Sequence, residues 1–391
     1  IEVNGKESLY SKQYNEGDTI KNVRFAETLE KISKFGPEIF YNGEIGELII
    51  DEVNESGGNM SMSDLNNYKS VWREPVIFKY KNLEIISMSL PSSGGILLGQ
   101  MLMGIEDSNI KEFGHNSVKS IQLMTELERR AYADRSHFMG DPDFMSLPVY
   151  ELIDKQYVRN RMVDFSWDTA TPSNKIKHGN IILNESDETT HYSIIDKFGN
   201  SVSVTTTLNN SYGSKVFVEN GGFFLNNEMD DFSSKPGYPN FYGLIGSEAN
   251  SIAPKKRMLS SMTPTIILKN NKPSMIVGTP GGSTIITSVF QTILNVYEFE
   301  MNIQDAVNAP RFHHQWLPDV VIFEEGILDT EKETILKSKN YFVIPLPIEI
   351  EVGGMSPRSS IGAVDAIFID DNGKVHTGAD FRGDDYGEIL K

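Results

Sequence analysis

The spacing of apolar residues changes near residue 189, and this change limits the possible folds more than any other feature of the chain. Before it, apolar residues recur mainly every three or four positions, which predicts helices. After it, short apolar and alternating runs predict strands. The segment 165–187 is polar and has no clear period, so we predict an exposed, mobile connection there and a boundary at Glu188–Thr189.

The expected elements follow this division. In the first part we expect helices near 23–32, 45–53, 96–105 and 116–136, and a pair of strands at 76–80 and 83–89. In the second part we expect strands at 191–195, 201–208, 216–225, 264–269 and 274–278, and helices near 283–297 and 303–308. Residues 1–188 therefore form a mostly helical part and residues 189–391 a part rich in strands.

The composition excludes several classes of protein. The 391 residues carry a net charge of −18, which disfavours binding to nucleic acid or to an anionic membrane surface. No apolar stretch reaches the roughly 18 residues that a membrane-spanning helix needs. The chain has 0 cysteines and no HExxH pattern, so we expect no disulfide, metal or cofactor. It begins at Ile1 without a methionine or a signal peptide, which we interpret as a mature or truncated piece.

A short turn sets the register of the first hairpin after the boundary. The sequence Asp196-Lys197-Phe198-Gly199-Asn200 is typical of a hairpin loop that closes on a glycine. If Asp196 pairs with Asn200, opposed residues have numbers that sum to 196 + 200 = 396. Thr189 then faces Thr207, with Cβ atoms roughly 5 Å apart, unless a bulge shifts the pairing by one.

Thr189 is the candidate nucleophile. A threonine hydroxyl needs a base, and no histidine or lysine lies at an obvious triad spacing. The α-amine of a threonine that begins a chain can serve as that base. Thr189 would gain a free amine if the Glu188–Thr189 bond broke first, and its own hydroxyl can attack the preceding carbonyl to give an ester that water opens. From the residues alone, the alternative is an ordinary threonine at the start of a strand.

Motifs spread over nearly the whole chain resemble those of the γ-glutamyltransferases (γ-glutamyl transpeptidases). The motifs are Pro91-Ser92-Ser93-Gly94-Gly95, Tyr132-Ala133-Asp134-Arg135, Gly140-Asp141-Pro142, Thr189-Thr190-His191-Tyr192-Ser193, Thr207-Leu208-Asn209, the runs 225–232 and 256–265, Pro280-Gly281-Gly282-Ser283 and the run 309–316. The resemblance implies an α+β, four-layer αββα N-terminal-nucleophile hydrolase fold, formed by residues 1–188 and 189–391 together.

The resemblance also implies an activity. It implies self-cleavage between Glu188 and Thr189 into a large and a small subunit that form a heterodimer. Glutathione or glutamine would donate a γ-glutamyl group to the threonine, and water, an amino acid or a peptide would accept it. A periplasmic or secreted location is implied too. Known members carry a further stretch ahead of the part that matches Ile1 onward, with an arginine that binds the substrate α-carboxylate, and we assign no residue here to that role.

Two pairs of small residues are candidates for the binding of charge. Gly281 and Gly282 follow a strand and precede a helix, where unobstructed N–H groups suit an oxyanion hole. Ser260 and Ser261 can both donate hydrogen bonds to a carboxylate. The alternatives are an ordinary strand-to-helix turn for the glycines and a helix cap or turn for the serines. The resemblance assigns the glycines, with Thr189 and Thr207, to catalysis and the serines to the substrate α-carboxylate.

The remaining candidates bind an ammonium group or cover the site. Asn209, Glu228 and Asp231 offer carbonyl and carboxylate acceptors for an ammonium, and solvated loop residues are the alternative. By resemblance they bind the substrate α-amino group. The loop 233–243 is rich in Pro, Gly and aromatic residues, and by resemblance its Tyr242 occupies the lid-aromatic position. A structured surface loop explains the same residues equally well.

Two other functions are alternatives to that of a γ-glutamyltransferase. The same fold could act on poly-γ-glutamate or on glutaryl amides, although the acceptors at 228 and 231 favour a donor with a free α-amino group. The chain could also be an unprocessed, non-catalytic remnant. Intact Thr189, Thr207, Gly281 and Gly282 argue against that reading.

Overall fold

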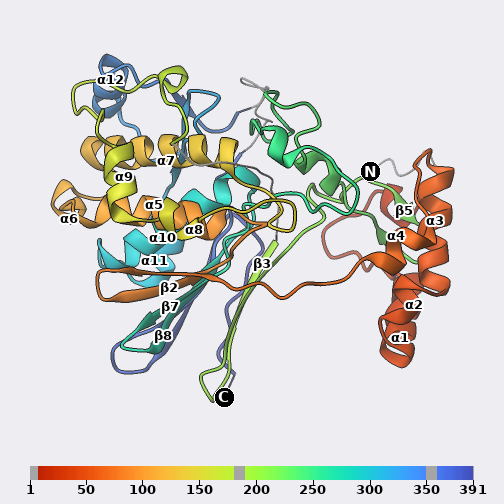
Figure 1. The fold of residues 1–391 in the computed structure, drawn as a ribbon. Coiled ribbons are helices and arrows are strands. Elements are labelled where there is room, and N and C mark those ends of the chain that lie inside the picture. Colours follow the sequence, from red (N-terminus) through yellow and green to blue (C-terminus); the bar gives the residue numbers. More distant parts are fainter. Residues whose placement is uncertain (1–7, 180–189, 349–358, 391) are drawn as a thin grey trace. The chain divides into compact units, whose positions relative to one another are not determined.

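The computed structural model describes residues 8–179, 190–348 and 359–390 (Figure 1). Their contacts divide the chain into two compact units, one of Ile1–Trp72 with Thr207–Glu228 and one of Arg73–Thr206 with Met229–Lys391. These units are spatial, whereas the predicted parts 1–188 and 189–391 describe a covalent cut, and that division stays a prediction. No helix within the described residues is long and apolar enough to cross a membrane.

The first unit is a small helical cluster. Its elements are η1 (Leu9–Ser11), α1 (Val23–Phe35), α2 (Glu38–Tyr41), α3 (Glu44–Glu55), α4 (Met62–Asn67), β5 (Phe217–Val218) and β6 (Phe223–Phe224). Ile45, Ile49 and Leu65 pack with Val218 as its core. The predicted strand 216–225 is two short strands instead, because the chain reverses through Gly222 at a φ of 76°.

A six-stranded antiparallel sheet organises the second unit. Its order is β1 (Val76–Tyr80), β2 (Leu83–Ser87), β7 (Thr265–Lys269), β8 (Lys272–Gly278), β12 (Asp365–Ile369) and β13 (Val375–Ala379). A three-stranded sheet consists of β11 (Val343–Pro345), β10 (Val321–Phe323) and β9 (Phe312–His313). Strands β12 and β13, which extend the sheet beyond β8, were not predicted from the sequence.

Helices cover one face of this sheet. They include α5 (Gly94–Glu106), α10 (Ile285–Tyr297) and α11 (Ile303–Asn308), with α7 (Val118–Phe138) packed on α5 (Figure 1). The shorter helices of the unit are α6 (Ile110–Phe113), α8 (Val149–Leu152), α9 (Lys155–Arg161), α12 (Thr330–Ser338) and the 3₁₀ turns η2 (Ser173–Lys175), η4 (Glu248–Asn250) and η5 (Gly282–Thr284). Buried side chains of α5, α7 and α10 form one core with Met275 and Val277 of β8.

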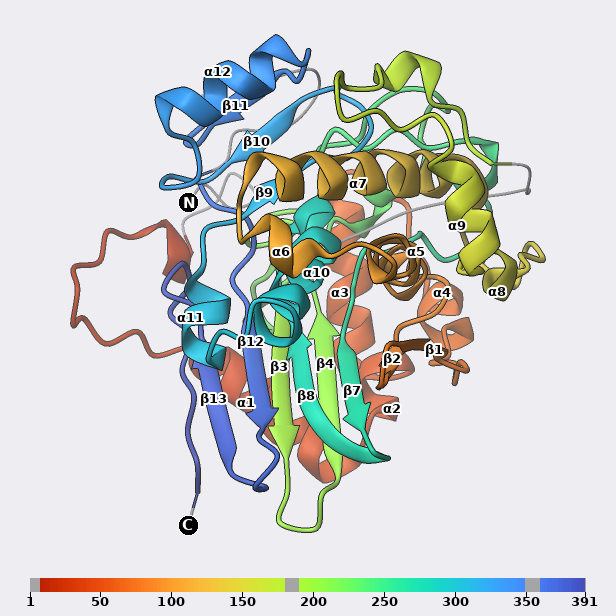
Figure 2. The same ribbon diagram turned by 90° about the vertical axis from the view of Figure 1, so that its left-hand side faces the viewer.

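The hairpin of β3 (Thr190–Ile195) and β4 (Ser201–Thr206) packs on the other face of the sheet, against β7, β8 and β12 (Figure 2). Val277 belongs to the core on the helical face, so the next residue, Gly278, faces the hairpin. The ring of His191 lies directly on Gly278, where a Cβ would collide with it. A helical layer, a sheet and a second β layer are therefore stacked within this unit.

The segment 165–179 corrects one prediction. We expected an exposed, mobile connection over 165–187, but Ala170, Ser173 and Ile176 are buried. The Ala170 amide bonds to the Lys339 carbonyl, and Trp316 Nε1 donates to the carbonyls of Ser173 and Ile176. The expectation was wrong here because isolated buried residues joined by backbone bonds leave no hydrophobic period. Residues 180–187 lie outside the described part of the chain.

Candidate active site

The β3–β4 hairpin has the register that the sequence predicted. Thr190 pairs with Thr206 and Ile195 with Ser201, so every opposed pair sums to 396. The regular ladder ends at Thr206, two residues short of the predicted strand end. Glu188 and Thr189 lie outside the described residues, so the facing of Thr189 and Thr207 stays a prediction. Thr207 Oγ1 accepts a hydrogen bond from the Asn209 amide at 2.6 Å.

His191 is a structural residue of the hairpin. Its Nδ1 lies 3.0 Å from Thr205 Oγ1 and its Nε2 3.0 Å from Ser193 Oγ. Burial lowers the pKa of its imidazole to about 3, because the charged form would lose its hydration. A neutral ring with both nitrogens bonded fixes β3 on the sheet and leaves no free proton acceptor for catalysis.

The two candidate oxyanion glycines form the turn between β8 and α10. Gly281 has a φ of 134° and Gly282 a φ of 61°, conformations that side chains disfavour. Thr284 Oγ1 donates to the Gly281 carbonyl at 2.7 Å. From α7, the Tyr132 hydroxyl donates to the Ser283 carbonyl. The turn is thus held from both sides, and its conformation requires glycine.

The Ser260–Ser261 segment is bonded to the segment that precedes α5. The Ser260 amide donates to the Pro91 carbonyl, and the Ser260 carbonyl accepts from the Ser93 amide, both at 2.7 Å. Ser92 Oγ and Ser93 Oγ donate to the same carbonyl at 2.8 and 3.0 Å. The buried Ser261 Oγ, in contrast, has no hydrogen-bond partner among the described residues.

A narrow cavity in the second unit is lined by Asp231 and Arg135, among other residues. Asp231 is buried at the end of η3 (Glu228–Asp231), and its carbonyl accepts from Asn250 Nδ2 at 2.7 Å. Arg135 is buried on α7, and its Nε donates to Ser93 Oγ at 3.0 Å. The same turn of α7 therefore contacts both the oxyanion turn, through Tyr132, and Ser93 in the segment that precedes α5, through Arg135.

The first unit holds the other two candidates for binding an amino group. Asn209 has a φ of 72°, and its Nδ2 donates to the Asn227 carbonyl at 3.1 Å. Both carboxyl oxygens of Glu228 are buried without a hydrogen-bond partner among the described residues. Burial raises the pKa of Glu228 to about 8. A cation beside this carboxyl group would restore its usual charge.

The candidate lid loop is ordered by its own hydrogen bonds. Asn240 Oδ1 accepts from the amides of Tyr242 and Leu244, both at 3.0 Å. The Tyr242 carbonyl accepts from Gln315 Nε2 at 3.0 Å. Tyr242 is half-buried against the main core. These contacts describe a structured loop, and the lid role stays a prediction.

Sequence reasoning gave no role to Ser92, Ser93, Tyr132 or Arg135, although all four lie in the quoted motifs. One signal was available: Ser92-Ser93 precede Gly94-Gly95, and a Cβ on Gly94 would collide with the Met262 carbonyl. A glycine pair at the start of a helix indicates that another backbone comes close.

Among the described residues, no group of three or more acidic, histidine or cysteine side chains could hold a metal ion.

Three comparisons place the chain among known proteins. A family described as "Gamma-glutamyltranspeptidase" matches residues 8–389. The glutathione hydrolase proenzyme of Escherichia coli (strain K12) is 41% identical over 370 residues, which cover 94% of this chain and 61% of that protein. That of Pseudomonas aeruginosa is 39% identical over 395 residues, covering 99% of this chain and 68% of the relative. The chain thus spans about three fifths to two thirds of these relatives.

Two acylases are also similar. The acylase ACY 1 proenzyme of Pseudomonas sp. (strain V22) is 33% identical over 360 residues, covering 92% of this chain and 60% of the relative. The crystal structure of a cephalosporin acylase from Bacillus halodurans superposes with a TM-score of 0.80 at 21% identity, over 96% of this chain and 64% of that one. This likeness confirms the predicted α+β fold, and the role of an N-terminal nucleophile in it stays a prediction.

Proposed function

The chain belongs to the gamma-glutamyltranspeptidase family, and from this premise we propose that it is a self-cleaving γ-glutamyltransferase and glutathione hydrolase. The names of its relatives support both parts, since they are called glutathione hydrolases and proenzymes. The observation that carries the proposal is the register of the β3–β4 hairpin, which pairs Thr190 with Thr206. If the same pairing continues by one residue, the Thr207 hydroxyl lies opposite Thr189.

Self-cleavage comes first. The Thr189 hydroxyl attacks the Glu188 carbonyl carbon, the C–N bond breaks, and the peptide nitrogen takes a proton to become the α-amine of Thr189. Water then opens the Glu188 ester, which frees the hydroxyl. The products are a large subunit ending at Glu188 and a small subunit starting at Thr189, which stay together as a heterodimer. The Thr207 hydroxyl orients that of Thr189 during the attack.

Turnover uses the amine that the cut created. The α-amine of Thr189 accepts the hydroxyl proton while the oxygen attacks the γ-carbonyl of the donor. The amides of Gly281 and Gly282 donate to the oxyanion of the tetrahedral intermediate. The leaving amine takes the proton, and a γ-glutamyl ester on Thr189 remains. Water or the amino group of an amino acid or peptide then attacks this ester and regenerates the threonine.

Two buried polar groups that have no hydrogen-bond partner among the described residues, the Ser261 hydroxyl and the Glu228 carboxyl group, indicate the substrate class. We propose that Ser260 and Ser261 bind the α-carboxylate of the donor. Glu228, Asp231 and Asn209 bind its α-ammonium, and Tyr242 covers it. A buried hydroxyl without a partner is costly, and a ligand carboxylate at Ser261 would remove that cost. Burial raises the pKa of Glu228 to about 8, and an ammonium bound beside it would favour the ionised form and so offset the cost of burial.

Glutaryl amides and poly-γ-glutamate are the competing donors, and two relatives are named acylases. A glutaryl group has no α-ammonium, so Glu228 would stay unpaired with it. A panel of glutathione, glutamine, poly-γ-glutamate and a glutaryl amide, assayed on wild type and on Thr189→Ala, tests the proposal. We expect glutathione and glutamine to be the preferred donors and Thr189→Ala to turn over none. A preferred glutaryl amide would contradict the donor class, and turnover by Thr189→Ala would contradict the nucleophile. A periplasmic or secreted location accords with this activity and is part of the proposal.

A further inference from the structure

Asp134 has no role in the proposed reaction, although it lies in a motif on which the family resemblance rests. Its side chain is buried on α7. Asp134 Oδ1 accepts from the Gly179 amide at 2.8 Å and lies 2.9 Å from Arg161 Nη2. Oδ2 accepts from Tyr157 Oη at 2.8 Å, from Gln100 Nε2 at 3.0 Å and from Arg161 Nε at 3.2 Å. One carboxyl group therefore joins three helices to the backbone at Gly179.

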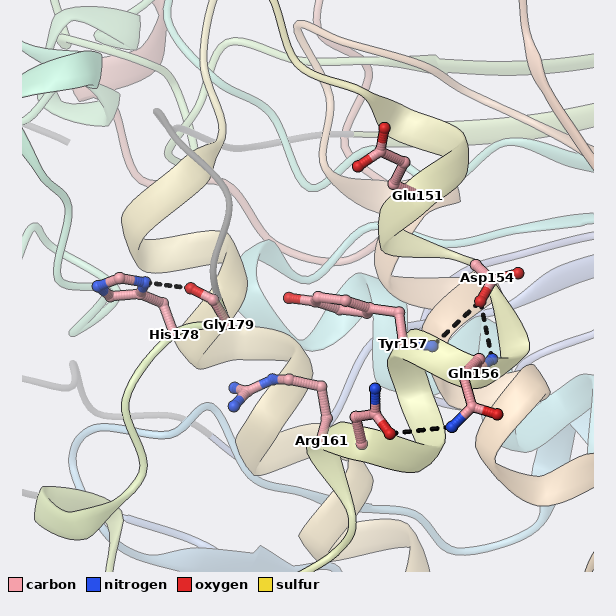
Figure 3. A pocket seen from close by; sticks show the side chains of 8 residues that line it. Glu151, Asp154, Gln156, Tyr157, Arg161, His178 and Gly179 are labelled. Atoms are coloured by element: carbon pink, nitrogen blue, oxygen red, sulfur yellow. Dashed lines mark hydrogen bonds between the residues drawn. The ribbon is translucent and has the colours of Figure 1, made fainter.

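The chain is closely fitted at this point. A Cβ on Gly179 would collide with the Tyr157 hydroxyl. The preceding residue, His178, stacks flat on His137 of α7, with ring centroids 3.4 Å apart and planes 3° from parallel. Figure 3 shows Tyr157 and Arg161, both from α9, on the wall of an open pocket of about 650 Å³ that His178 and Gly179 also line. Gly179 is held by a hydrogen bond, by a steric fit and by the ring stack beside it.

We propose that Asp134 is a positioning residue for self-cleavage: by holding the Gly179 amide, it fixes the chain ahead of the bond that Thr189 attacks. This rests on the proposed function. After that bond, β3 begins at Thr190 and is fixed on the sheet by His191. The attacked bond thus lies between two fixed points, Gly179 and Thr190, and the ten residues 180–189 separate them. An attack within the chain depends strongly on the alignment of the reacting atoms.

The size of the slowing of self-cleavage distinguishes an alignment of the reacting atoms from a simple shortening of the loop between two fixed points. Without the Gly179 contact, the next fixed point upstream is His178, whose ring stacks on His137, so the stretch between the two fixed points grows from ten to eleven residues. Loop-closure entropy alone would then slow cleavage by no more than about 1.2-fold. Because the contact also aligns the chain, we expect at least about a fivefold slowing. Once the bond is cut, alignment ahead of Glu188 no longer matters, so turnover by cut enzyme stays unchanged.

Two variants test this from opposite sides of the contact. Asp134→Ala removes the acceptor, whereas Gly179→Ala places a Cβ against the Tyr157 hydroxyl, which disturbs the fit at Gly179 while both Asp134 and Arg161 remain. Tyr157→Phe is the matched control, because it removes one bond to the same carboxyl group but keeps the Gly179 contact. The cleavage half-time of freshly made precursor is followed on denaturing gels, and kcat and KM are then measured on the fully cut protein.

We expect both alanine variants to cleave at least fivefold more slowly than wild type, with kcat and KM within twofold of wild type after cutting, and Tyr157→Phe to cleave within twofold. If Gly179→Ala cleaves less than twofold more slowly than wild type, the inference is overturned, even if Asp134→Ala does not fold. An equal loss of turnover in the cut variants would overturn it too, since Asp134 would then support the whole site. A wild type that never cuts, or a Thr189→Ala that still cuts, contradicts the proposed function instead.

Discussion

The Ser93 amide donates a hydrogen bond to the Ser260 carbonyl at 2.7 Å, across 167 positions of the chain. Together with the Ser92 and Ser93 hydroxyls, it fixes the backbone that carries Ser261. The Ser261 hydroxyl takes no part in these bonds. Ser92 and Ser93 therefore hold this backbone, whereas Ser261 is the residue that we propose to bind the substrate carboxylate.

This separation predicts different results for neighbouring serines. Ser261→Ala should raise KM for γ-glutamyl donors at least about tenfold, because a charged hydrogen bond to the substrate is lost. It should not lower the free energy of unfolding, since the Ser261 hydroxyl makes no hydrogen bond within the described part of the chain. Ser92→Ala is the control, and it should cost about 1–3 kcal/mol because the buried carbonyls of Ser260 and Met262 lose a donor. Steady-state kinetics measure KM, and urea unfolding measures the free energy of unfolding, for both variants. An unchanged KM for Ser261→Ala would show that this residue does not bind the donor.

A second prediction concerns the oxyanion turn. Gly281→Ala puts a side chain at a φ of 134°, with its Cβ 3.0 Å from Gly362 Cα. The turn must shift, and the two amides with it. We expect kcat to fall by about 10²–10³-fold, the loss seen when one oxyanion donor is removed, with a much smaller change in KM. Gly326→Ala, another glycine with positive φ but with no atom near its Cβ, is the control for backbone strain alone. Equal kcat values for the two variants would argue against an oxyanion role.

Glu228 predicts a pH dependence of donor binding. Its carboxyl group is protonated below a pKa of about 8 and charged above it. The α-ammonium of the donor binds the charged form, so KM should fall as the pH rises from 6 to 8. Glu228→Gln cannot ionise and should show a flat KM over this range. A KM for wild type that is independent of pH from 6 to 8 would show that Glu228 does not bind the ammonium.

His191 predicts a loss of stability in acid. Its pKa is about 3 in the folded protein against an ordinary 6.5. Below pH 6.5 the unfolded chain gains a proton on His191 that the folded chain does not, so stability falls as the pH falls from 6.5 towards 3. His191→Gln retains hydrogen bonding but does not titrate. The difference in unfolding free energy between wild type and this variant should shrink with acidification, and a constant difference would contradict the buried neutral ring.

Local signals in the sequence were sufficient for part of this structure. The turn 196–200 fixed the hairpin register, and helical spacing located α7 and α10 within a few residues. The pair β12 and β13 was missed although its signal was present: Asp370-Asp371-Asn372-Gly373 separates two short apolar runs, as in a hairpin. Contacts such as Ser93–Ser260 and Asp134–Gly179 join distant segments through single polar groups. Neither spacing nor propensity encodes such contacts.

The central claim is that Thr189 becomes the first residue of a chain. Mass measurement and N-terminal sequencing of the purified protein after long incubation test it most directly. We expect two fragments, of 188 residues and of 391 − 188 = 203 residues, the second beginning Thr189-Thr190-His191-Tyr192-Ser193. Thr189→Ala should remain a single chain of 391 residues. A wild type that stays uncut, or a small fragment that begins at any other residue, would contradict it.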